Sequence, residues 1–431
     1  MTFAAEKLKY ACHLRGRIGW QNLRSDEFTD DGPYLITGMH FANGRVDWEK
    51  CYHVSEERYA IDSSIHVQPG DLLVTKDGSI GKLAYIDSLP GPACLNSHLL
   101  LIRPRDGRIS TFFLYYLLQS DEFQRFILEQ QSGTTFYGIS QESIENFKAR
   151  FPVSLVDQVA VAQHIERKTS MLDGLIAKKQ NFITLLAENR AAVISHAVTL
   201  GLDPGVPLRY SGFPWIGDMP AHWTTVRLRH LSPRVGVGLV INPSTYTASE
   251  GVPFIFGGNV LESGFKLEGV RFIDALDSQN LAASMLHPGD LVTVRVGYPG
   301  VTAVVPPSLE GANCASVMIV RKGKRFDSNW LCYAMNSRVV RYQVERVQYG
   351  AAQEQFNISH AVDFRFPVPP LSEQAQIADY LRARTSELAA SIDRTLRSIA
   401  LLREYRSALI TAGVTGELEI REHEQRLEAL A

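Results

Sequence analysis

The hydrophobic residues of this chain follow two spacings that alternate along the sequence. Short segments rich in Val, Ile, Tyr and Phe are interrupted by Gly, Pro and Asp about every ten residues, which predicts β-strands joined by turns. In residues 111–130 and 329–347, aromatic and aliphatic side chains recur at helical spacing instead. Each half of the chain therefore reads as strands followed by a helix.

Two longer segments carry the strongest helical pattern, in which apolar positions step alternately by four and three residues. This spacing is typical of a coiled-coil seam. The first seam consists of Val161, Ile165, Lys168, Leu172, Ile176, Lys179, Ile183, Leu186, Arg190, Val193 and Ala197. The second consists of Ile377, Leu381, Arg384, Leu388, Ile392, Thr395, Ile399, Leu402, Arg406, Leu409 and Gly413.

Neither long helix could bury such a stripe alone, and each occurs once in the chain. We therefore expect the two helices to pair along their seams. The first would extend about 66 Å from Leu155 to Val198, at 1.5 Å per residue. The alternative is that each stripe packs against its own globular domain.

The second half of the chain repeats the first. "GPYLITG" from Gly32 pairs with "VPFIFGG" from Val252, and "LLLIR" ending at Arg103 pairs with "VMIVR" ending at Arg321. Such an ordered set of matches predicts two copies of one folding unit. The expected organisation is a first domain, a spacer helix, a linker, a second domain, and a second spacer helix with a C-terminal tail, over residues 1–152, 153–200, 201–212, 213–367 and 368–431. The fold class is α+β, with two similar globular domains separated by two long helices.

One repeated stretch has the look of a phosphate-binding loop. "GDLLVTKDGSIGK", residues 70–82, has two glycines and a terminal Gly-Lys pair, but Lys76 stands where the motif needs glycine and Leu83 where it needs Ser or Thr. Its copy, "HPGDLVTVRVGYPG" in residues 287–300, keeps the glycines and loses the lysines. The element that both copies share is a strand and a glycine bend, which favours a structural turn over a nucleotide site.

Composition restricts the function further. At 431 residues, with 45% hydrophobic and 21% charged residues, the chain has the composition of a globular protein with two or three domains. It has no apolar run long enough for a membrane span, and the N-terminal "MTFAAEKLKY" is charged where a signal peptide is apolar, so we expect a cytoplasmic protein. The net charge of −2 means that any DNA binding needs local basic clusters or basic partners.

Motifs for catalysis are missing from the sequence. Five cysteines without a C-x-x-C pair indicate neither a disulfide framework nor a zinc site. There is no Asn/Asp-Pro-Pro-Tyr/Phe motif that would hold an adenine for methylation, and no glycine-rich loop for S-adenosylmethionine. Glu166 and Lys168, with Asp157 upstream, give a nuclease-like spacing, but on the seam helix. We expect no catalytic residue, metal or cofactor in this chain, and a P-loop or nuclease-type enzyme using Lys82 or Glu166 remains as the catalytic alternative.

Two similar domains held apart by rigid helices suit a partner that has two recognition sites at a set distance, and duplex DNA is such a partner. Specificity would then come from side chains that enter the grooves. A coiled-coil adaptor that joins proteins without reading DNA is the non-catalytic alternative.

Several segments also resemble the DNA-specificity subunits of type I restriction-modification systems. They are "PGDLLVTKDGSIGKLAYID" from Pro69, "LLAENRAAVISHAVTLGL" from Leu185, "WIGDMPAHWTTVRLRHL" from Trp215, "FPVPPLSEQAQIADYL" from Phe366 and "LLREYRSALITAGVTGEL" from Leu401. The resemblance covers essentially the whole chain, in the family's order of recognition domain and helix, twice. One departure is that the first domain lacks the "WIG…P.HW" lead-in of the second.

The resemblance implies a non-catalytic subunit that selects a split, asymmetric DNA target, with one half read by each domain. It also implies that the helices form an antiparallel coiled coil, relate the domains by a pseudo-twofold axis, and dock two methyltransferase subunits. These subunits would use S-adenosylmethionine to methylate adenine N6, and restriction subunits would add a translocase and endonuclease that needs ATP and Mg²⁺. Half-site centres about one DNA turn apart, roughly 34 Å, would suit such a protein.

The expected DNA contacts are polar residues in loops that follow the strands, where glycines let the backbone approach a duplex. Gln and Asn suit adenine, and Arg and Lys suit guanine. In the first domain these residues are Lys76, Ser79, Lys82, Asn96, Ser97, His98, Thr134, Thr135 and Tyr137. In the second they are Asn259, Arg295, Tyr298, Gln353, Gln355 and Asn357. Ordinary turn residues are also polar, so each position has a purely structural reading as well.

Overall fold

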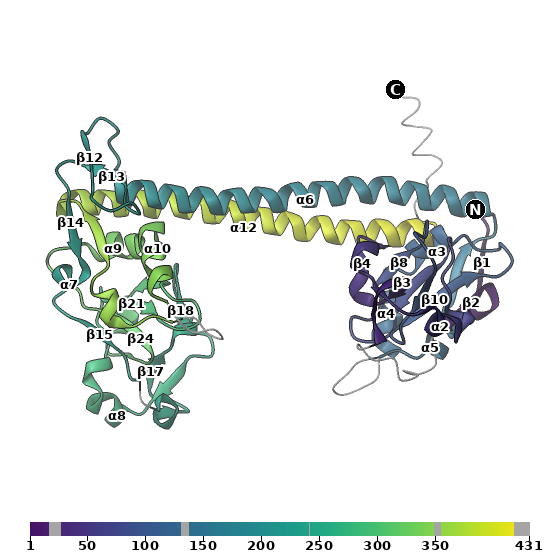
Figure 1. Cartoon of the computed structure of the whole chain (residues 1–431), viewed down its shortest axis with the longest axis horizontal. Helices are drawn as coiled ribbons and strands as arrows, with labels where there is room; N and C mark the ends of the chain where they lie inside the picture. Colours follow the sequence, from purple (N-terminus) through teal and green to yellow (C-terminus); the bar gives the residue numbers. More distant parts are fainter. Residues whose placement is uncertain (17–26, 131–137, 241, 349–354, 418–431) are drawn as a thin grey trace. The chain divides into compact units, whose positions relative to one another are not determined.

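A computed structural model describes residues 1–16, 27–130, 138–240, 242–348 and 355–417. The chain forms two compact units, which are residues 1–180 with 396–431 (unit 1) and residues 181–395 (unit 2). Each unit contains one expected globular domain and the parts of both long helices that pack against it (Figure 1). Among the described residues, none of the helices is both long and apolar enough to span a bilayer.

A four-stranded antiparallel sheet in the order β2-β10-β7-β8 organises the globular part of unit 1, beside a three-stranded sheet in the order β6-β3-β9. The strands are β1 (Phe3–Lys7), β2 (Cys12–Gly16), β3 (Thr29–Ile36), β4 (Phe41–Ala42), β5 (Arg45–Val46), β6 (Tyr52–His53), β7 (Leu72–Thr75), β8 (Leu83–Tyr85), β9 (Ala93–Leu95), β10 (Leu99–Pro104) and β11 (Lys148–Pro152). The α-helices are α1 (Leu8–Ala11), α2 (Glu56–Ala60), α3 (Thr111–Leu117), α4 (Asp121–Gln130), α5 (Gln141–Asn146) and α6 (Leu155–Leu200).

Unit 2 repeats this plan, with sheets in the orders β15-β24-β21-β22 and β16-β20-β17-β23. The strands are β12 (Leu208–Tyr210), β13 (Asp218–Pro220), β14 (Thr224–Arg227), β15 (Val235–Val237), β16 (Thr247–Ala248), β17 (Val252–Ile255), β18 (Val260–Leu261), β19 (Gly264–Phe265), β20 (Arg271–Ile273), β21 (Leu291–Val294), β22 (Thr302–Val304), β23 (Asn313–Cys314), β24 (Val317–Val320) and β25 (Arg365–Val368). The α-helices are α7 (Leu228–Leu231), α8 (Ala275–Asn280), α9 (Ser328–Asn336), α10 (Arg338–Val347), α11 (Ile358–Ala361) and α12 (Leu371–Thr415). The α+β class is therefore confirmed, with the same strand order in the four-stranded sheet that organises each domain.

The central strand of each domain is buried on both faces. Leu72 and Val74 point into a core formed with α3 and α4, whereas Leu73 points into a second core formed with β3 and β9. Burial on both sides explains why "DLLVT" is a continuous apolar run rather than an alternating one. The end of this strand is therefore held firmly, which matters for the loop that follows it.

The repeated Asp and Arg of the sequence form a buried ion pair in each domain. Asp71, 1% exposed, accepts hydrogen bonds from Arg103 Nε and Nη2 at 2.6 and 2.7 Å. Asp290, 2% exposed, accepts one from Arg321 Nη1 at 2.6 Å. Each pair joins the start of the central strand to the end of its antiparallel neighbour, which explains why both residues recur.

Each expected helix before the polar loop is two helices. Residues 111–130 form α3 and α4, and residues 329–347 lie in α9 and α10. The breaks fall at Ser120 and Ser337, whose buried hydroxyls donate to the carbonyls of Leu117 and Ala334 at 2.7 Å. A serine hydroxyl that bonds to a carbonyl three residues back competes with continued helix, and the apolar spacing alone did not reveal this break.

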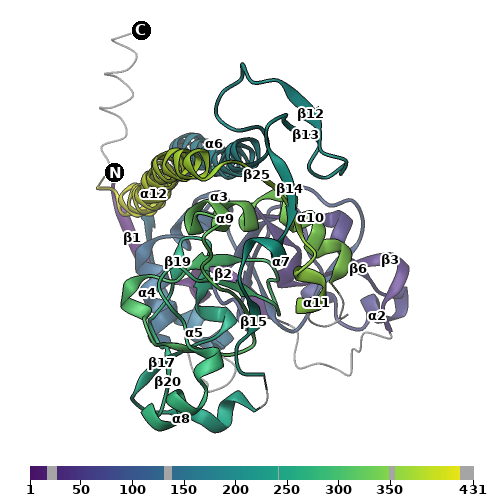
Figure 2. The ribbon, with the colours of Figure 1, turned by 90° about the vertical axis from the view of Figure 1, so that its left-hand side faces the viewer.

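The seams expected on the long helices are buried or half-buried at every position. Between residues 171 and 192 of α6, every residue off the seam is exposed. Within unit 1, Ile410 and Val414 of α12 share a core with Val161 and Ile165 of α6. Within unit 2, Ile377 and Leu381 share one with Ala197. The start of one helix thus packs with the end of the other in both units, which makes the pair antiparallel (Figures 1 and 2).

A buried glutamine fixes the first turn of each long helix to its domain. Gln158 accepts a hydrogen bond from Ser110 N at 2.7 Å and donates to the carbonyls of Arg108 and Pro152. Gln374 does the same in unit 2, where it accepts from Asp327 N at 2.8 Å. Both side chains are at most 1% exposed. These bonds set the direction in which each helix leaves its domain.

The lead-in that only the second domain has packs on the start of α12. Trp223 Nε1 donates to Glu373 at 3.1 Å, and His222 Nε2 lies 2.9 Å from the same carboxylate. In unit 1, the residue after α12, Gly416, lies against the ring of Phe3. The end of α12 thus meets the start of the first domain.

Removing the charge of Asp290 should destabilise the protein, because Arg321 would keep its burial and lose its carboxylate partner. We expect Asp290→Asn to lower the free energy of unfolding by about 2–3 kcal/mol, measured by urea denaturation and calorimetry. Asp87→Asn is the matched control, since Asp87 is exposed in its pair with Arg45 and should matter by less than about 1 kcal/mol. Equal effects of the two substitutions would contradict a structural role for the buried pair.

Candidate nucleic-acid interface

Four segments of the first domain meet where the central strand β7 ends. They are the turn after β3, the β7–β8 hairpin loop, the β9–β10 turn and the segment before α5. We call them loop cluster 1, which consists of residues 37–40, 76–82, 96–98 and 138–140.

Main-chain hydrogen bonds of Lys76 hold three of these segments together. Its N–H donates to the carbonyl of His98 at 2.9 Å, and its carbonyl accepts from Ile139 N at 2.9 Å. The next residue, Asp77, forms a β-bridge with Gly138. These bonds use no side chain, so the arrangement tolerates changes of side chain at the same positions.

The fourth segment packs against the end of β7. A Cβ placed on Gly38 would lie 2.7 Å from Cγ2 of Thr75, so the backbone of this turn approaches the strand closely. The β9–β10 turn joins the same group, because Asn96 N donates to the carbonyl of Ile36 at 3.0 Å.

The second domain has the same arrangement with different side chains. Loop cluster 2 consists of residues 256–259, 295–301, 315–317 and 355–357. Phe356 N donates to the carbonyl of Arg295 at 3.2 Å, and Val296 forms a β-bridge with Gln355, as Asp77 does with Gly138. Ala315 N donates to the carbonyl of Ile255 at 2.8 Å. The backbone of the cluster is thus repeated, including the bridge.

The glycine loop between β7 and β8 is a hairpin turn. The carbonyl of Thr75 accepts a hydrogen bond from Gly81 N at 2.9 Å, and the hydroxyl of Thr75 donates one to the carbonyl of Ser79 at 2.5 Å. Gly78 and Gly81 have φ of 71° and 82°, values that a residue with a Cβ seldom adopts. A phosphate loop joins a strand to a helix, whereas this loop joins two antiparallel strands, so the P-loop alternative is wrong on topology.

The two clusters differ in charge. In cluster 1, Asp77 Oδ2 lies 2.8 Å from Lys76 Nζ and 3.2 Å from His98 Nδ1. In cluster 2 the position of Asp77 is taken by Val296, and that of His98 by Ser316, the residue before β24. Arg295 there donates from Nε to the carbonyl of Phe356 at 3.2 Å. Cluster 1 therefore presents a carboxylate with two basic side chains beside it, and cluster 2 presents one arginine and no carboxylate.

Two of the expected contact residues use their amides within the fold. Asn96 Oδ1 accepts from His98 N at 3.2 Å. Asn259 Oδ1 accepts from Phe256 N at 2.9 Å, and its Nδ2 donates to the carbonyl of Lys266 at 3.0 Å. These side chains position the loops in the free protein, which is the structural reading that sequence alone left open.

The remaining expected contacts that the structure describes lie in the two clusters, and their side chains differ in exposure. Ser79, Lys82, Tyr298 and Asn357 are exposed, and Ser97 and Gln355 are half-buried. Thr134, Thr135, Tyr137 and Gln353 lie outside the described residues.

The expected contacts did not include the turn at residues 37–40 or Asp77, which the structure places in cluster 1. Met39 in this turn is 79% exposed, and His40 caps the turn by accepting from Thr37 N at 3.1 Å. The sequence did contain a signal for this turn, because the repeat aligns it with the turn of the second domain that contains Asn259, one of the expected contacts.

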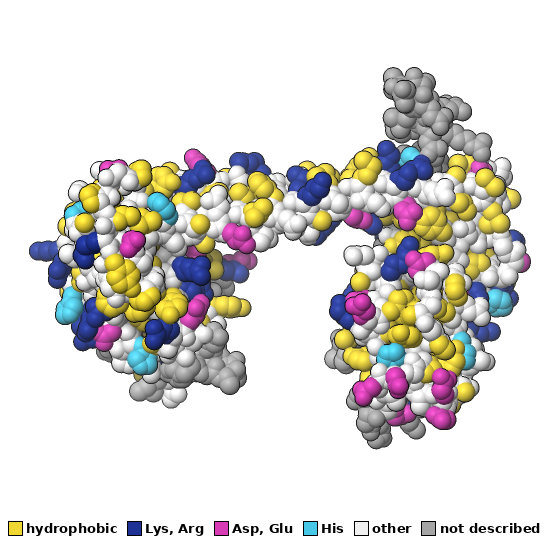
Figure 3. Space-filling view, turned by 45° about the horizontal axis from the view of Figure 1, so that its top comes forward, with side chains coloured by type: hydrophobic (Ala, Val, Ile, Leu, Met, Phe, Trp, Pro, Cys, Tyr) yellow, Lys and Arg dark blue, Asp and Glu magenta, His cyan; other side chains and the backbone are white. Residues whose placement is uncertain are grey.

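Surface charge also differs between the domains. Acidic residues outnumber basic ones in residues 1–152, and the reverse holds in residues 213–367. On the face shown in Figure 3, Asp and Glu side chains gather at one end of unit 1, on the right.

In unit 2 an open hollow of about 610 Å³ is lined by His230, Leu231, Ser232, Pro233, Lys322, Gly323, Lys324 and Arg325. It follows β24 at the opposite end of the sheet from cluster 2.

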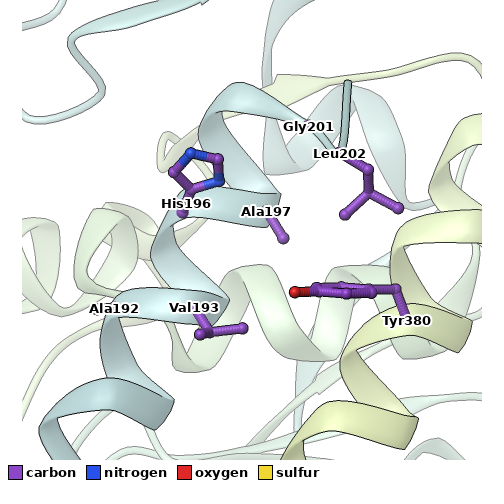
Figure 4. A pocket seen from close by; sticks show the side chains of 7 residues that line it. All are labelled: Ala192, Val193, His196, Ala197, Gly201, Leu202 and Tyr380. Atoms are coloured by element: carbon purple, nitrogen blue, oxygen red, sulfur yellow. The ribbon is translucent and has the colours of Figure 1, made fainter. Parts of the chain in front are cut away.

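A second open hollow of about 400 Å³ lies on the helices of unit 2. Tyr380 of α12 faces Val193 and Ala197 of α6 across it, with Ala192, His196, Gly201 and Leu202 completing the lining (Figure 4). Its walls are mostly apolar and it lacks convergent polar groups, so it has no chemistry that suggests a catalytic pocket.

Catalytic arrangements are not found in the part of the chain that the structure describes. There, no group of three His, Cys, Asp or Glu side chains could hold a metal ion, and Glu166 belongs to no such group. Burial raises the pKa of Cys12, Cys51 and Cys314 to about 12, which keeps these thiols protonated and unreactive.

Comparisons with known proteins agree on one family. A family model described as "Type I restriction modification DNA specificity domain" matches residues 19–185. A putative type I restriction enzyme MjaX specificity subunit of Methanocaldococcus jannaschii is 22% identical over 81% of this chain and 80% of its own length. The type I restriction enzyme StySPI specificity subunit of Salmonella potsdam is 20% identical over 90% of this chain and 83% of its own.

Solved structures show the same fold. A chain from a study of complex assembly and conformational transition of the type I R-M system has a TM-score of 0.69 and 17% identity, covering 96% of this chain and 98% of its own. The HsdS subunit from Thermoanaerobacter tengcongensis has a TM-score of 0.52 and 15% identity, covering 96% and 97%. Residues 19–185 therefore match the DNA-specificity domain of type I restriction-modification systems, and the chain as a whole is similar in sequence to type I specificity subunits and in fold to an HsdS subunit.

Proposed function

We propose that this subunit selects a bipartite, asymmetric DNA target, of which loop cluster 1 reads one half and loop cluster 2 reads the other. The paired helices set the gap between the half-sites and dock two methyltransferase subunits. Restriction subunits complete a translocating endonuclease. The S-adenosylmethionine, ATP and Mg²⁺ that these activities need belong to the partner subunits, and the complex acts on DNA in the cytoplasm.

The observation that carries the proposal is the repeated loop cluster. Both copies are tied by main-chain bonds at corresponding residues, while the side chains at those residues differ. A scaffold that is kept while its exposed side chains change is what two different half-sites require. Arg295 suits guanine and Gln355 suits adenine, and each bidentate contact contributes about 1–3 kcal/mol of discrimination.

Charge explains why partners are needed. With a net charge of −2, the chain attracts phosphates weakly overall. We therefore infer that basic surfaces of the methyltransferase subunits supply much of the non-specific affinity, and that this chain supplies the choice of sequence.

The outer face of α6 supports the docking of partners. Met171, Leu175, Phe182 and Leu185 lie off the seam and are 72%, 42%, 49% and 60% exposed. Apolar side chains at helical spacing on a face that no part of the described chain covers are typical of a protein interface. The same observation suits a coiled-coil adaptor that never reads DNA, so the experiments must separate the two functions.

Methylation mapping tests the proposal directly. The chain should be co-expressed with the methyltransferase subunit encoded beside it in a host that lacks adenine methylation, and N6-methyladenine mapped by single-molecule sequencing. We expect one split motif with a fixed unspecified gap. The methyltransferase subunit alone is the control. A stable complex that adds no methylation would favour the adaptor.

Substitutions in one cluster should affect only one half of the motif. Lys76→Ala should relax base choice in the half read by the first domain, and Arg295→Ala should relax it in the other half. Each lost contact corresponds to about 1–3 kcal/mol of discrimination. Methylomes of the two variants measure this directly, and Lys50→Ala, an exposed lysine outside cluster 1, is the control. Relaxation of both halves by one substitution would contradict independent reading.

The spacer helices should behave as a ruler. Deletion of one heptad from each helix, residues 176–182 and 397–403, keeps the seam in phase and removes about 10 Å, or roughly three base pairs. We expect a shorter gap in the methylated motif or loss of methylation. Replacement of the same heptads by Ala-rich heptads of equal length is the control. An unchanged gap in the shortened protein would show that the helices do not set it.

A further inference from the structure

Each loop cluster carries one outlying apolar side chain. Among the described residues, Tyr298 and Met39 are the two most exposed large hydrophobic side chains, at 82% and 79%. Tyr298 belongs to cluster 2 and Met39 to cluster 1. Burial of such a side chain contributes about 1.5–3 kcal/mol of favourable free energy. Their exposure on fixed loops therefore indicates that a partner covers them.

The loops that carry these side chains are well fixed. The hairpin of Tyr298 is closed by Gly300 N, which donates to the carbonyl of Val294 at 2.9 Å, and Gly297 and Gly300 have φ of 90° and 101°. The turn of Met39 is closed by its own N–H, which donates to Thr37 Oγ1 at 3.3 Å. Both side chains are therefore presented in a set direction and do not sit on chain that could fold back over them.

The two apolar side chains come from different loops. Tyr298 aligns with Ser79 in the first domain. In the structure, Met39 corresponds to Gly258, because His40 and Asn259 cap equivalent turns by accepting from Thr37 N and Phe256 N. In each cluster one position is large and apolar, and the matching position of the other cluster is small. A shared structural role would place the large side chain on the same loop twice, whereas contact with two different base sequences would not.

We propose that Tyr298 and Met39 are specificity-determining residues that each contact the 5-methyl group of a thymine, one in each half-site. The thymine methyl is the apolar group that the major groove presents. Contact with it needs no hydrogen bond and suits an exposed thioether or the edge of a phenol ring. This inference rests on the proposed reading of DNA by the two clusters, and it names one base in each half-site.

Deoxyuridine, which lacks this methyl, gives the test. The chain is purified with its methyltransferase subunit, and duplexes of its methylated motif are made with one thymine at a time replaced by deoxyuridine. Dissociation constants are measured by fluorescence anisotropy. For the unaltered complex, one replacement in each half-site should weaken binding by roughly 3- to 10-fold. Tyr298→Ser should abolish the effect in its half-site only, and Met39→Ala in the other only.

Two variants serve as matched controls. Leu276 on α8 is 72% exposed and Ile61 after α2 is 57% exposed, and neither belongs to a loop cluster. Leu276→Ala and Ile61→Ala should keep both deoxyuridine effects. Thermal unfolding of all four variants should match that of the unaltered chain, since these side chains pack little within the fold.

The outcomes separate the inference from the function beneath it. If the unaltered complex prefers its motif but no deoxyuridine effect depends on Tyr298 or Met39, the thymine contact is overturned and the reading of DNA stands. The thymine contact is also overturned if 2-aminopurine fluorescence shows base unstacking that Tyr298→Ser removes, because the side chain is then a wedge. A complex without preference for any motif overturns the proposed function itself.

Discussion

The loops at the end of each central strand are held by the backbone, and the rest of the molecule can be understood from this constraint. The carbonyl of Lys76 accepts from Ile139 N, and the carbonyl of Arg295 accepts from Phe356 N. The main chain thereby makes the bond that both clusters share, and the side chain of Arg295 adds a further bond to the carbonyl of Phe356 in cluster 2 only. Lys76 and Asp77 can become Arg295 and Val296 without loss of the bridge that joins the loops. A shared backbone with different side chains suits the proposed reading of two different half-sites.

The remainder of each domain keeps that platform rigid. Burial of the central strand on both faces, and the ion pair between Asp71 and Arg103, leave the loops little freedom to shift with the core. The buried Gln158 and Gln374 then connect each domain to the first turn of a long helix. Packing and hydrogen bonds thus connect loop, sheet and helix inside each unit, which suits the spacing role proposed for the helices.

Much of the fold could be predicted from the sequence, because the periodic spacing of apolar positions indicates the helices and strands. The seams of α6 and α12 follow directly from the alternation of four and three, and the duplication gives the two α+β domains. The breaks at Ser120 and Ser337 could not be predicted, since they depend on the hydroxyls bonding back to the preceding turn. Hydrophobic spacing continues through both breaks.

The candidate site was predicted less completely. The expected contacts of the first domain lie in three of the four segments of cluster 1, and the turn with Met39 was not among them because its most exposed side chain is apolar. Asn259 was chosen as a polar loop residue, and its amide is used to close its own turn. Which polar loop atoms remain available to a ligand depends on contacts between segments far apart in the chain, and local sequence does not contain them.

Selection of a split target requires that both loop clusters read the same DNA duplex together. Hydrogen-deuterium exchange of the complex with methyltransferase subunits tests this most directly, by comparison of its methylated motif with a duplex of scrambled sequence. We expect that only the motif duplex slows exchange, in residues 76–82, 96–98 and 138–140 and in 295–301, 315–317 and 355–357, with one domain affected by each half-site. Protection confined to one domain, or to segments outside both clusters, would contradict reading by the two clusters.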